Sequence, residues 1–229
     1  MDRAIDAEEL LDGPLDDSDA LAANLRDLAR INRLSGGGQL SLRAVRALGH
    51  AGSILDVGTG GADIPALLLA DARRSGRRLA VTATDSRQEV LDAALAVRPS
   101  LAAMPDLTLA VADGRHLPYP GAAFDIGHAS LVLHHLDERG AVEFLTELRR
   151  VARLGVVVND LARGRWFWLG AMIVTHTFAA SRFTRRDGPL SVRRAWTQAE
   201  MIELMRQAGI APVATFSGFA HHRYAIAAR

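Results

Sequence analysis

Two adjacent histidines and a distant aspartate could carry out proton transfer. His134 and His135 lie within the segment 130–136, and Asp160 follows the apolar run that ends at Asn159. Histidine titrates near neutral pH, so it can accept a proton from a hydroxyl or a protonated amine, and a carboxylate can orient its ring. The sequence leaves open which histidine acts. The alternatives are that the histidines only contact a cofactor or end a strand, and that Asp160 caps a helix.

A glycine-rich turn within residues 53–63 could hold a nucleotide-like ligand. The sequence Ser-Ile-Leu-Asp-Val-Gly-Thr-Gly-Gly-Ala-Asp is typical of an apolar strand that runs into a turn and opens a helix. Glycine lets the backbone approach a ligand where a side chain would obstruct it. The dinucleotide fingerprint has glycine or alanine at the sixth position of the turn, whereas Asp63 would repel a pyrophosphate there. A dehydrogenase is therefore disfavoured, and a tight turn without a ligand is the simplest alternative.

Three motifs in order along the chain resemble the class I S-adenosylmethionine-dependent methyltransferases. They are Asp-x-Gly-x-Gly from Asp56, the acidic end of the second expected strand at Asp85, and Ala-Asp-Gly around Asp113. The likeness covers about residues 54–160 and departs at Ala62, where the family often has a third glycine. It implies S-adenosylmethionine as cofactor, whose ammonium and sulfonium suit carboxylates. The cofactor-binding residues that it implies are Asp56, Gly58, Thr59, Gly60, Gly61, Asp85, Ser86, Ala112, Asp113, Gly114 and Ser130.

The Leu-His-His-Leu segment resembles more narrowly the ubiquinone/menaquinone-type small-molecule methyltransferases, in which such a histidine lies in the active site. The resemblance implies transfer of a methyl group to a small molecule, and we expect a hydroxyl of an aromatic, phenolic or polyketide-like metabolite as acceptor. His134, His135 and Asp160 are the expected catalytic residues. The alternatives are methylation at carbon or nitrogen of a small lipophilic metabolite and a non-catalytic, cofactor-binding partner of a biosynthetic complex.

The pattern of elements predicts one α/β domain: a Rossmann-like, seven-stranded, mostly parallel sheet flanked by helices. An N-terminal helical cap spans 1–50, a cofactor-binding core 51–162, a lid insertion 163–196, and a C-terminal helix with closing strands 197–229. We expect strands at 53–57, 79–84, 107–112, 124–130, 155–159, 211–215 and 223–228. Helices are expected at 21–34, with a stop at the glycines 36–38, and at 41–48, 64–74, 88–97, 138–153 and 198–208.

The insertion is predicted to cover the acceptor. It holds all three tryptophans of the chain, and apolar aromatic side chains are common in small-molecule sites. Trp168, Arg194 and Trp196 are therefore predicted to bind substrate, the alternative being that the tryptophans seal the insertion onto the domain. The apolar run 166–180 falls short of the roughly 20 residues that a bilayer requires, so a buried or lid helix is expected there.

Composition narrows the chemistry further. The chain has 229 residues, no cysteine and no lysine, so thiolate metal sites, a cysteine nucleophile and Schiff-base chemistry are excluded, and no metal is expected. A net charge of +1 does not favour nucleic acid as a partner. The acidic N-terminus does not read as a secretory signal, so we expect a cytoplasmic protein without an integral membrane segment and leave a homo-oligomer open.

Overall fold

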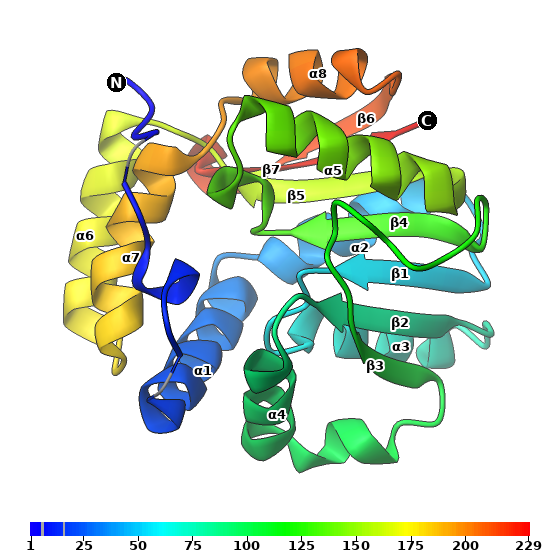
Figure 1. Cartoon of the computed structure of the whole chain (residues 1–229), viewed down its shortest axis with the longest axis horizontal. Coiled ribbons are helices and arrows are strands. Elements are labelled where there is room, and N and C mark those ends of the chain that lie inside the picture. The colour runs from blue at the N-terminus through cyan, green and yellow to red at the C-terminus, as the bar shows by residue number, and fades with distance from the viewer. Residues whose placement is uncertain (6, 16) are drawn as a thin grey trace.

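A computed structural model describes residues 1–5, 7–15 and 17–229 of the chain. Its centre is one seven-stranded sheet in the order β3-β2-β1-β4-β5-β7-β6 (Figure 1). Only β7 runs antiparallel to its neighbours β5 and β6, which confirms the predicted mostly parallel sheet. The strands are β1 (Ser53–Val57), β2 (Ala80–Asp85), β3 (Leu107–Val111), β4 (Phe124–Ser130), β5 (Ala152–Leu161), β6 (Pro212–Ser217) and β7 (Arg223–Ala228).

Helices cover both faces of the sheet. They are α1 (Ser18–Leu34), α2 (Gly37–Ala47), α3 (Asp63–Arg74), α4 (Gln88–Val97), α5 (Glu138–Val151), α6 (Arg165–Phe178), α7 (Arg182–Arg194) and α8 (Gln198–Gln207). Short 3₁₀ turns include η1 (Leu10–Asp12) and η3 (Leu133–His135). One face carries α5 and α8, and the other carries α2 and α3, as Figure 1 shows.

The central strands are apolar because both of their faces are covered. Every residue of β1 from Ile54 to Val57 is buried, and so is every residue of β7. One apolar cluster joins β1, β4 and β5 to α5 and α8, and a second joins the opposite face to α2 and α3. Strands buried on both faces read as continuous apolar runs, which is why the sequence predicts this part of the sheet well.

Two predicted boundaries are wrong. The glycines 36–38 were expected to separate two helices, but Gly36 alone makes the turn at φ +74°, and α2 begins at Gly37. Strand β5 begins at Ala152 rather than at residue 155, so α5 ends earlier than predicted. Ala152 is buried and pairs with Phe124 of β4. Because this pairing stabilises the extended conformation, the chain leaves the helix at Val151 although the preceding residues have a helical pattern.

The carboxyl ends of the parallel strands are covered by segments from outside the sheet. Residues 1–5 and 7–15 of the N-terminal segment and α1 lie across this edge, and the insertion after β5 folds into α6 and α7 beside them (Figure 1). In the described part of the chain, no helix has the length and apolar character needed to cross a membrane.

Candidate functional site

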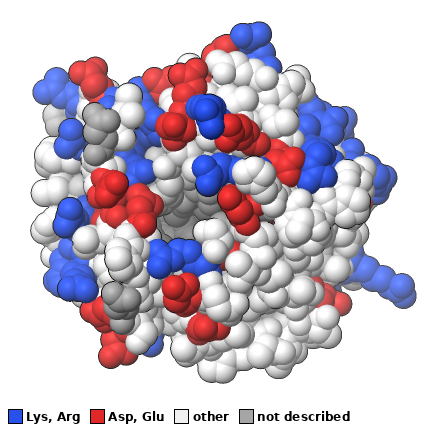
Figure 2. All heavy atoms as spheres, viewed as in Figure 1, with Lys and Arg blue, Asp and Glu red and all other residues white. Residues whose placement is uncertain are grey.

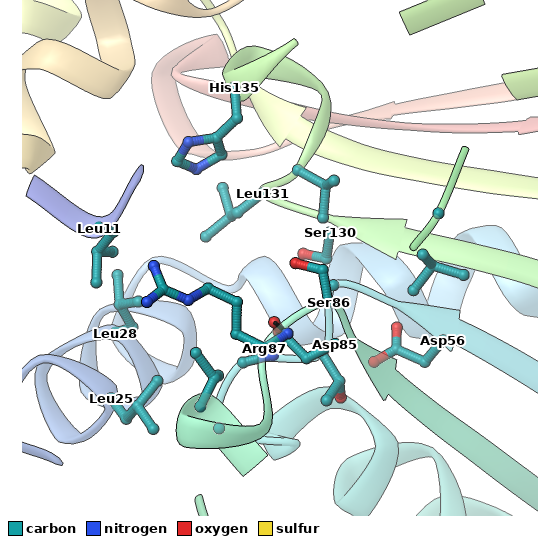
Figure 3. Close-up of a pocket in the computed structure, with 18 of the residues that line it drawn as sticks. Leu11, Leu25, Leu28, Asp56, Asp85, Ser86, Arg87, Ser130, Leu131 and His135 are labelled. Carbon is teal, nitrogen blue, oxygen red and sulfur yellow. Dashed lines mark hydrogen bonds between the residues drawn. The ribbon is translucent and has the colours of Figure 1, made fainter. Parts of the chain in front are cut away.

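A cavity of about 660 Å³ lies at the carboxyl ends of β1, β2 and β4. Figure 2 shows it as a hollow rimmed by acidic and basic side chains, and Figure 3 shows residues that line it. Ligands of open α/β sheets bind at this edge. All of the residues predicted to bind the cofactor, from Asp56 to Ser130, line this one cavity. The structure therefore brings together motifs that are far apart in the sequence.

The glycine-rich turn needs its glycines for two reasons. Gly58 has φ +72° and Gly60 has φ +52°, a left-handed backbone that side chains disfavour. A Cβ at Gly58 would also lie 2.4 Å from Cγ2 of Val132. The backbone of the turn is thus exposed to the cavity. Ala62, at the position where the third glycine was missing, adopts φ +50° and is buried.

Asp85 ties the second strand to this turn. Its Oδ2 accepts a hydrogen bond from the backbone N–H of Gly60 at 3.1 Å, and its Oδ1 accepts from that of Arg87 at 3.3 Å. Burial raises the pKa of Asp85, and the hydrogen bonds from Gly60 and Arg87 oppose that rise. Next to it, Oγ1 of Thr59 is buried without a hydrogen-bond partner. An unsatisfied hydroxyl in a cavity wall indicates a polar ligand.

Asp56 is the second carboxylate of the cavity, and buried side chains outside the cavity hold it in place. It contacts Nδ1 of His128 on β4, and Nε2 of that ring lies 2.8 Å from Oγ of Ser41. Asn159 donates to the same hydroxyl at 2.7 Å. All four side chains are buried, so the carboxylate is fixed by a continuous hydrogen-bonded network. Sequence reasoning missed His128, although a histidine within a buried strand is a signal of such a network.

Arg223 continues the same network from β7. Its guanidinium donates to the side-chain oxygens of Asn159 and Asn32, both at 2.6 Å, and to that of Ser130 at 2.8 Å. Burial lowers the pKa of Arg223 to about 10. A Cβ at Gly37 would lie 2.3 Å from this guanidinium, so the glycine makes room for it. Ser130 and Asn32 line the cavity, and Arg223 therefore positions part of its wall.

The other end of the cavity is lined mostly by leucines, with the guanidinium of Arg87 among them, where it donates to the carbonyl of Gly13 (Figure 3). Leucines of the N-terminal segment and of α1 form this wall, namely Leu11, Leu15, Leu21, Leu25 and Leu28. The imidazole of His135 lies above it, close to Leu131 (Figure 3). Leu131 has φ +59°, which is strained for a leucine, so the chain turns sharply where β4 leads into the histidines.

The structure separates the two histidines. His135 lines the cavity and places Nδ1 2.9 Å from Oδ1 of Asp12. His134 is buried, is not among the cavity-lining residues, and places Nδ1 2.7 Å from Oδ1 of Asp160. Burial acts to raise the pKa of Asp160, but His134 and Arg223 outweigh it and bring that pKa below its ordinary value. Asp160 is therefore a partner of His134 rather than of the cavity.

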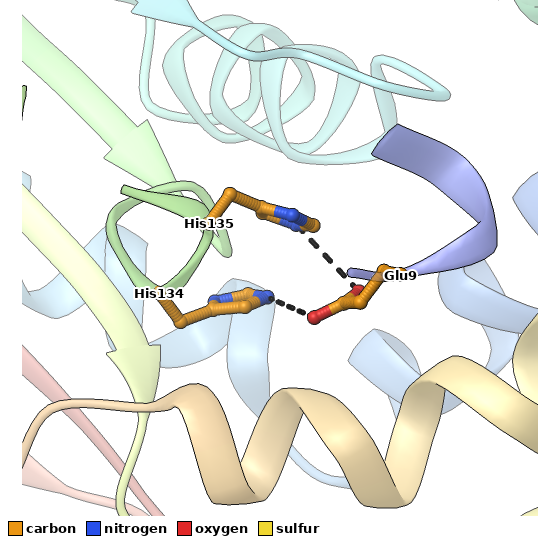
Figure 4. A group of neighbouring side chains, drawn as sticks. All are labelled: Glu9, His134 and His135. Carbon is orange, nitrogen blue, oxygen red and sulfur yellow. Dashed lines mark ion pairs between the residues drawn. The ribbon is translucent and has the colours of Figure 1, made fainter. Parts of the chain in front are cut away.

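Glu9 completes this group, and sequence reasoning missed it. Its carboxylate lies between the two rings, 3.9 Å from Nε2 of His134 and 3.9 Å from Nε2 of His135 (Figure 4). Burial raises the pKa of Glu9 to about 7, and His135 and Arg194 limit the rise. The three groups lie within 4.8 Å, a spacing that a metal could also use. The guanidinium of Arg194 lies 3.8 Å from Oε1 of Glu9, so a positive charge already faces this carboxylate.

The three residues predicted to bind substrate lie beside the cavity-lining residues and not among them, and their role stays a prediction. Arg194 is buried and donates to Asp12 and to the carbonyl of His135. Trp196 is buried and donates from Nε1 to the carbonyl of Leu133 at 2.9 Å. Trp168 is partly buried on α6, and none of the three is among the residues that line the cavity. Arg194 and Trp196 hold the η3 turn, so they act on the site through His135.

Comparison with known proteins agrees with this geometry. Residues 54–155 match the methyltransferase domain family. Among curated proteins, no sequence matches the chain. A S-adenosylmethionine-dependent methyltransferase from Aquifex aeolicus has the same fold, with a TM-score of 0.64 and 18% identity over 90% of this chain and 97% of that one.

Two longer proteins share the fold as well. The mitomycin 7-O-methyltransferase MmcR has a TM-score of 0.68 and 18% identity over 93% of this chain and 58% of its own. Human N-acetylserotonin methyltransferase, in complex with S-adenosylmethionine, has a TM-score of 0.67 and 14% identity over 96% of this chain and 60% of its own. This chain thus spans about three fifths of each.

Over residues 54–155 the chain resembles the methyltransferase domain family, and it shares the fold of methyltransferases that use S-adenosylmethionine. The cavity fits that cofactor, because its polar end carries Asp56, Asp85 and Asp113 against a glycine turn whose backbone is open. Carboxylates suit an ammonium and a sulfonium, and would repel a phosphate. Asp85 stands where ribose hydroxyls are bound in this architecture. Individual contacts of these residues with the cofactor stay predictions.

Proposed function

We propose that the enzyme methylates a hydroxyl group of a small lipophilic acceptor of aromatic, phenolic or polyketide-like type. The observation that carries the proposal is the division of one cavity into a carboxylate end and a leucine end, with His135 above the latter. Bound S-adenosylmethionine supplies an activated methyl group. The protein then has to hold the acceptor beside it, and an apolar wall excludes water while it does so.

His135 is the residue that we propose as proton acceptor. Its Nδ1 faces the carboxylate of Asp12, so the ring keeps its proton on that atom and Nε2 is the free base. Glu9 lies beyond Nε2 and can receive or share the proton. A hydroxyl loses its proton as the oxygen becomes methylated, so this chain of groups meets the chemical need.

His134 and Asp160 are proposed as positioning residues. Asp160 accepts from the backbone N–H of His134 at 3.3 Å as well as facing its ring, and both side chains are buried. This pair fixes the η3 turn from the side of β5, and so fixes the direction of the His135 ring. The ubiquinone/menaquinone type of methyltransferase is supported by the Leu-His-His-Leu segment alone and is proposed on that basis.

Calorimetry tests the cofactor half of the proposal. S-Adenosylmethionine should bind the wild-type enzyme, and Asp85→Ala should weaken binding at least about tenfold because a charge-assisted hydrogen bond is lost. Asp92→Ala, which changes an exposed aspartate of α4, is the matched control and should bind normally. Equal affinity in wild type and Asp85→Ala would count against the assigned site.

Turnover with labelled cofactor tests the acceptor half. In a panel of phenols, amines and activated carbon acids, the phenols should be methylated and yield methyl ethers. His135→Gln should lower kcat by about 10²–10⁴ with unchanged cofactor affinity. His50→Gln changes an exposed histidine that does not line the cavity and is the control, for which kcat should be unchanged. Methylated nitrogen or carbon in the product would favour the corresponding alternative. Cofactor binding without transfer to any acceptor would favour the non-catalytic role.

A further inference from the structure

Helix α6 presents apolar side chains to solvent along its outer side. It packs against α7, and Figure 1 shows α7 between it and the sheet. On its outer side Trp166 is 82% exposed, Ile173 59% and Phe178 67%, and Leu169 and Val174 are exposed as well. A helix that is apolar on all sides is normally buried on all sides. A contiguous apolar surface of this kind marks an interaction site.

The surroundings of this helix are basic. From residue 161 to residue 186 the sequence contains no aspartate or glutamate but five arginines. Arg165, Arg185 and Arg186 are exposed, and so is Arg182, which pairs with Asp17. At the C-terminal end of α6, Arg30 of α1 donates to the carbonyl of Phe178 at 3.5 Å. The partner of this surface therefore has to accept both apolar side chains and positive charge.

We propose that α6 docks on an anionic lipid bilayer, lying in the plane of its surface with Trp166, Ile173 and Phe178 among the acyl chains. Its 14 residues form a rod about 21 Å long, which suits an interfacial helix and cannot span the membrane. Basic side chains beside the apolar face gain from the negative surface potential. The proposal concerns where the enzyme works and does not depend on the identity of the acceptor.

A second copy of the chain fits this surface less well. Two copies related by a two-fold axis would bring α6 against α6, and the arginines that flank one helix would meet those of the other. Like charges close together at an interface oppose association. An anionic surface neutralises the same arginines, so charge favours the bilayer over the dimer.

Tryptophan fluorescence and sedimentation with vesicles test the proposal. Vesicles of phosphatidylglycerol and phosphatidylcholine should carry down the wild-type protein and shift Trp166 emission to the blue, and Trp166→Phe should remove that shift. Binding to pure phosphatidylcholine, or in 0.5 M salt, should be weaker by at least about tenfold. Equal binding to both kinds of vesicle, or no binding to either, would overturn the proposal.

Two variants distinguish binding through the α6 surface from non-specific binding to vesicles. Ile173→Asp should abolish sedimentation with anionic vesicles, whereas Val213→Asp changes a 49% exposed valine on β6 and should bind like wild type. Melting temperatures of both variants close to that of wild type show that they fold. Light scattering tests the alternative occupant. If the wild-type protein is a stable dimer and Ile173→Asp is a monomer, the surface binds a second copy of the chain, and the bilayer proposal is wrong.

Discussion

Replacing Glu9 by glutamine should change how the stability of the enzyme depends on pH. Glu9 is 3% exposed and faces His134 and His135 of η3, Arg194 and Asp187 of α7, and Asp12 of its own segment. Its pKa rises from 4.5 to about 7 in the folded protein, mainly because burial disfavours the charged form. The folded state therefore holds a proton between these two values that the unfolded state has lost.

The sign and size of the effect follow from that difference. The contribution of Glu9 to the free energy of unfolding is complete below about pH 4.5. It is lost as the pH rises through the folded-state pKa of about 7. One pH unit corresponds to about 1.4 kcal/mol, so the loss amounts to about 3 kcal/mol across the window. Glutamine carries no proton to lose, and the Glu9→Gln variant lacks this decline.

Urea unfolding at pH 5, 6, 7 and 8 measures the effect directly. The free energy of unfolding of wild type relative to Glu9→Gln should fall by about 2.5 kcal/mol between pH 5 and pH 8, since part of the window lies below pH 5. Glu8→Gln removes an exposed neighbouring carboxylate and should follow the wild-type curve. If the free energies of unfolding of wild type and Glu9→Gln change with pH in parallel, Glu9 is ionised throughout this range. The proposal that Glu9 exchanges a proton with His135 would then be refuted.

Three further changes test the glycine turn, the buried network around Arg223 and the cap of α5. Gly58→Ala should weaken binding of S-adenosylmethionine in calorimetry, since its Cβ would meet Val132 at 2.4 Å; Gly76→Ala, with φ +65° and open space, should cost only backbone strain of about 1 kcal/mol and bind normally. Arg223→Met should lower the free energy of unfolding by about 3–5 kcal/mol in urea titration, because it leaves buried polar partners unsatisfied; a loss below 1 kcal/mol would contradict the described network. Asp137→Ala should cost about 1 kcal/mol in the same assay, because Asp137 caps α5 by accepting from Gly140 at 2.7 Å, and an unchanged midpoint would argue against the cap.

The meeting of the glycine-rich turn and the acidic strand end in one cavity could be predicted because their signals are local. The strand at 53–57, the glycines after it and the acidic residue at Asp85 each follow from a few neighbouring residues. Parallel strands place such segments at one edge of a sheet, so sequence order alone indicates that they meet. The structure brings the end of that strand, the glycines and Asp85 to one cavity.

The leucine end of the cavity and the group around His135 could not be predicted because their contacts join distant segments. Glu9 and His135 are separated by more than one hundred residues, and nothing in the acidic N-terminal sequence indicates that they meet. The tryptophans of the insertion led to the prediction that residues 163–196 cover the acceptor. The leucines that line the cavity come instead from the N-terminal segment and α1. An aromatic cluster predicts an apolar surface but not which side of the molecule it faces.

The origin of the two walls has a consequence for how this enzyme can be altered. The residues predicted to bind the donor follow residue 53, whereas the leucines come from the N-terminal segment and α1, and Leu25 of α1 lies 3.7 Å from where a Cβ of Gly61 would stand. Under the proposed function, exchanging Leu11, Leu15 or Leu28 should reshape the room offered to the acceptor, whereas exchanging Leu25 should also disturb the glycine turn.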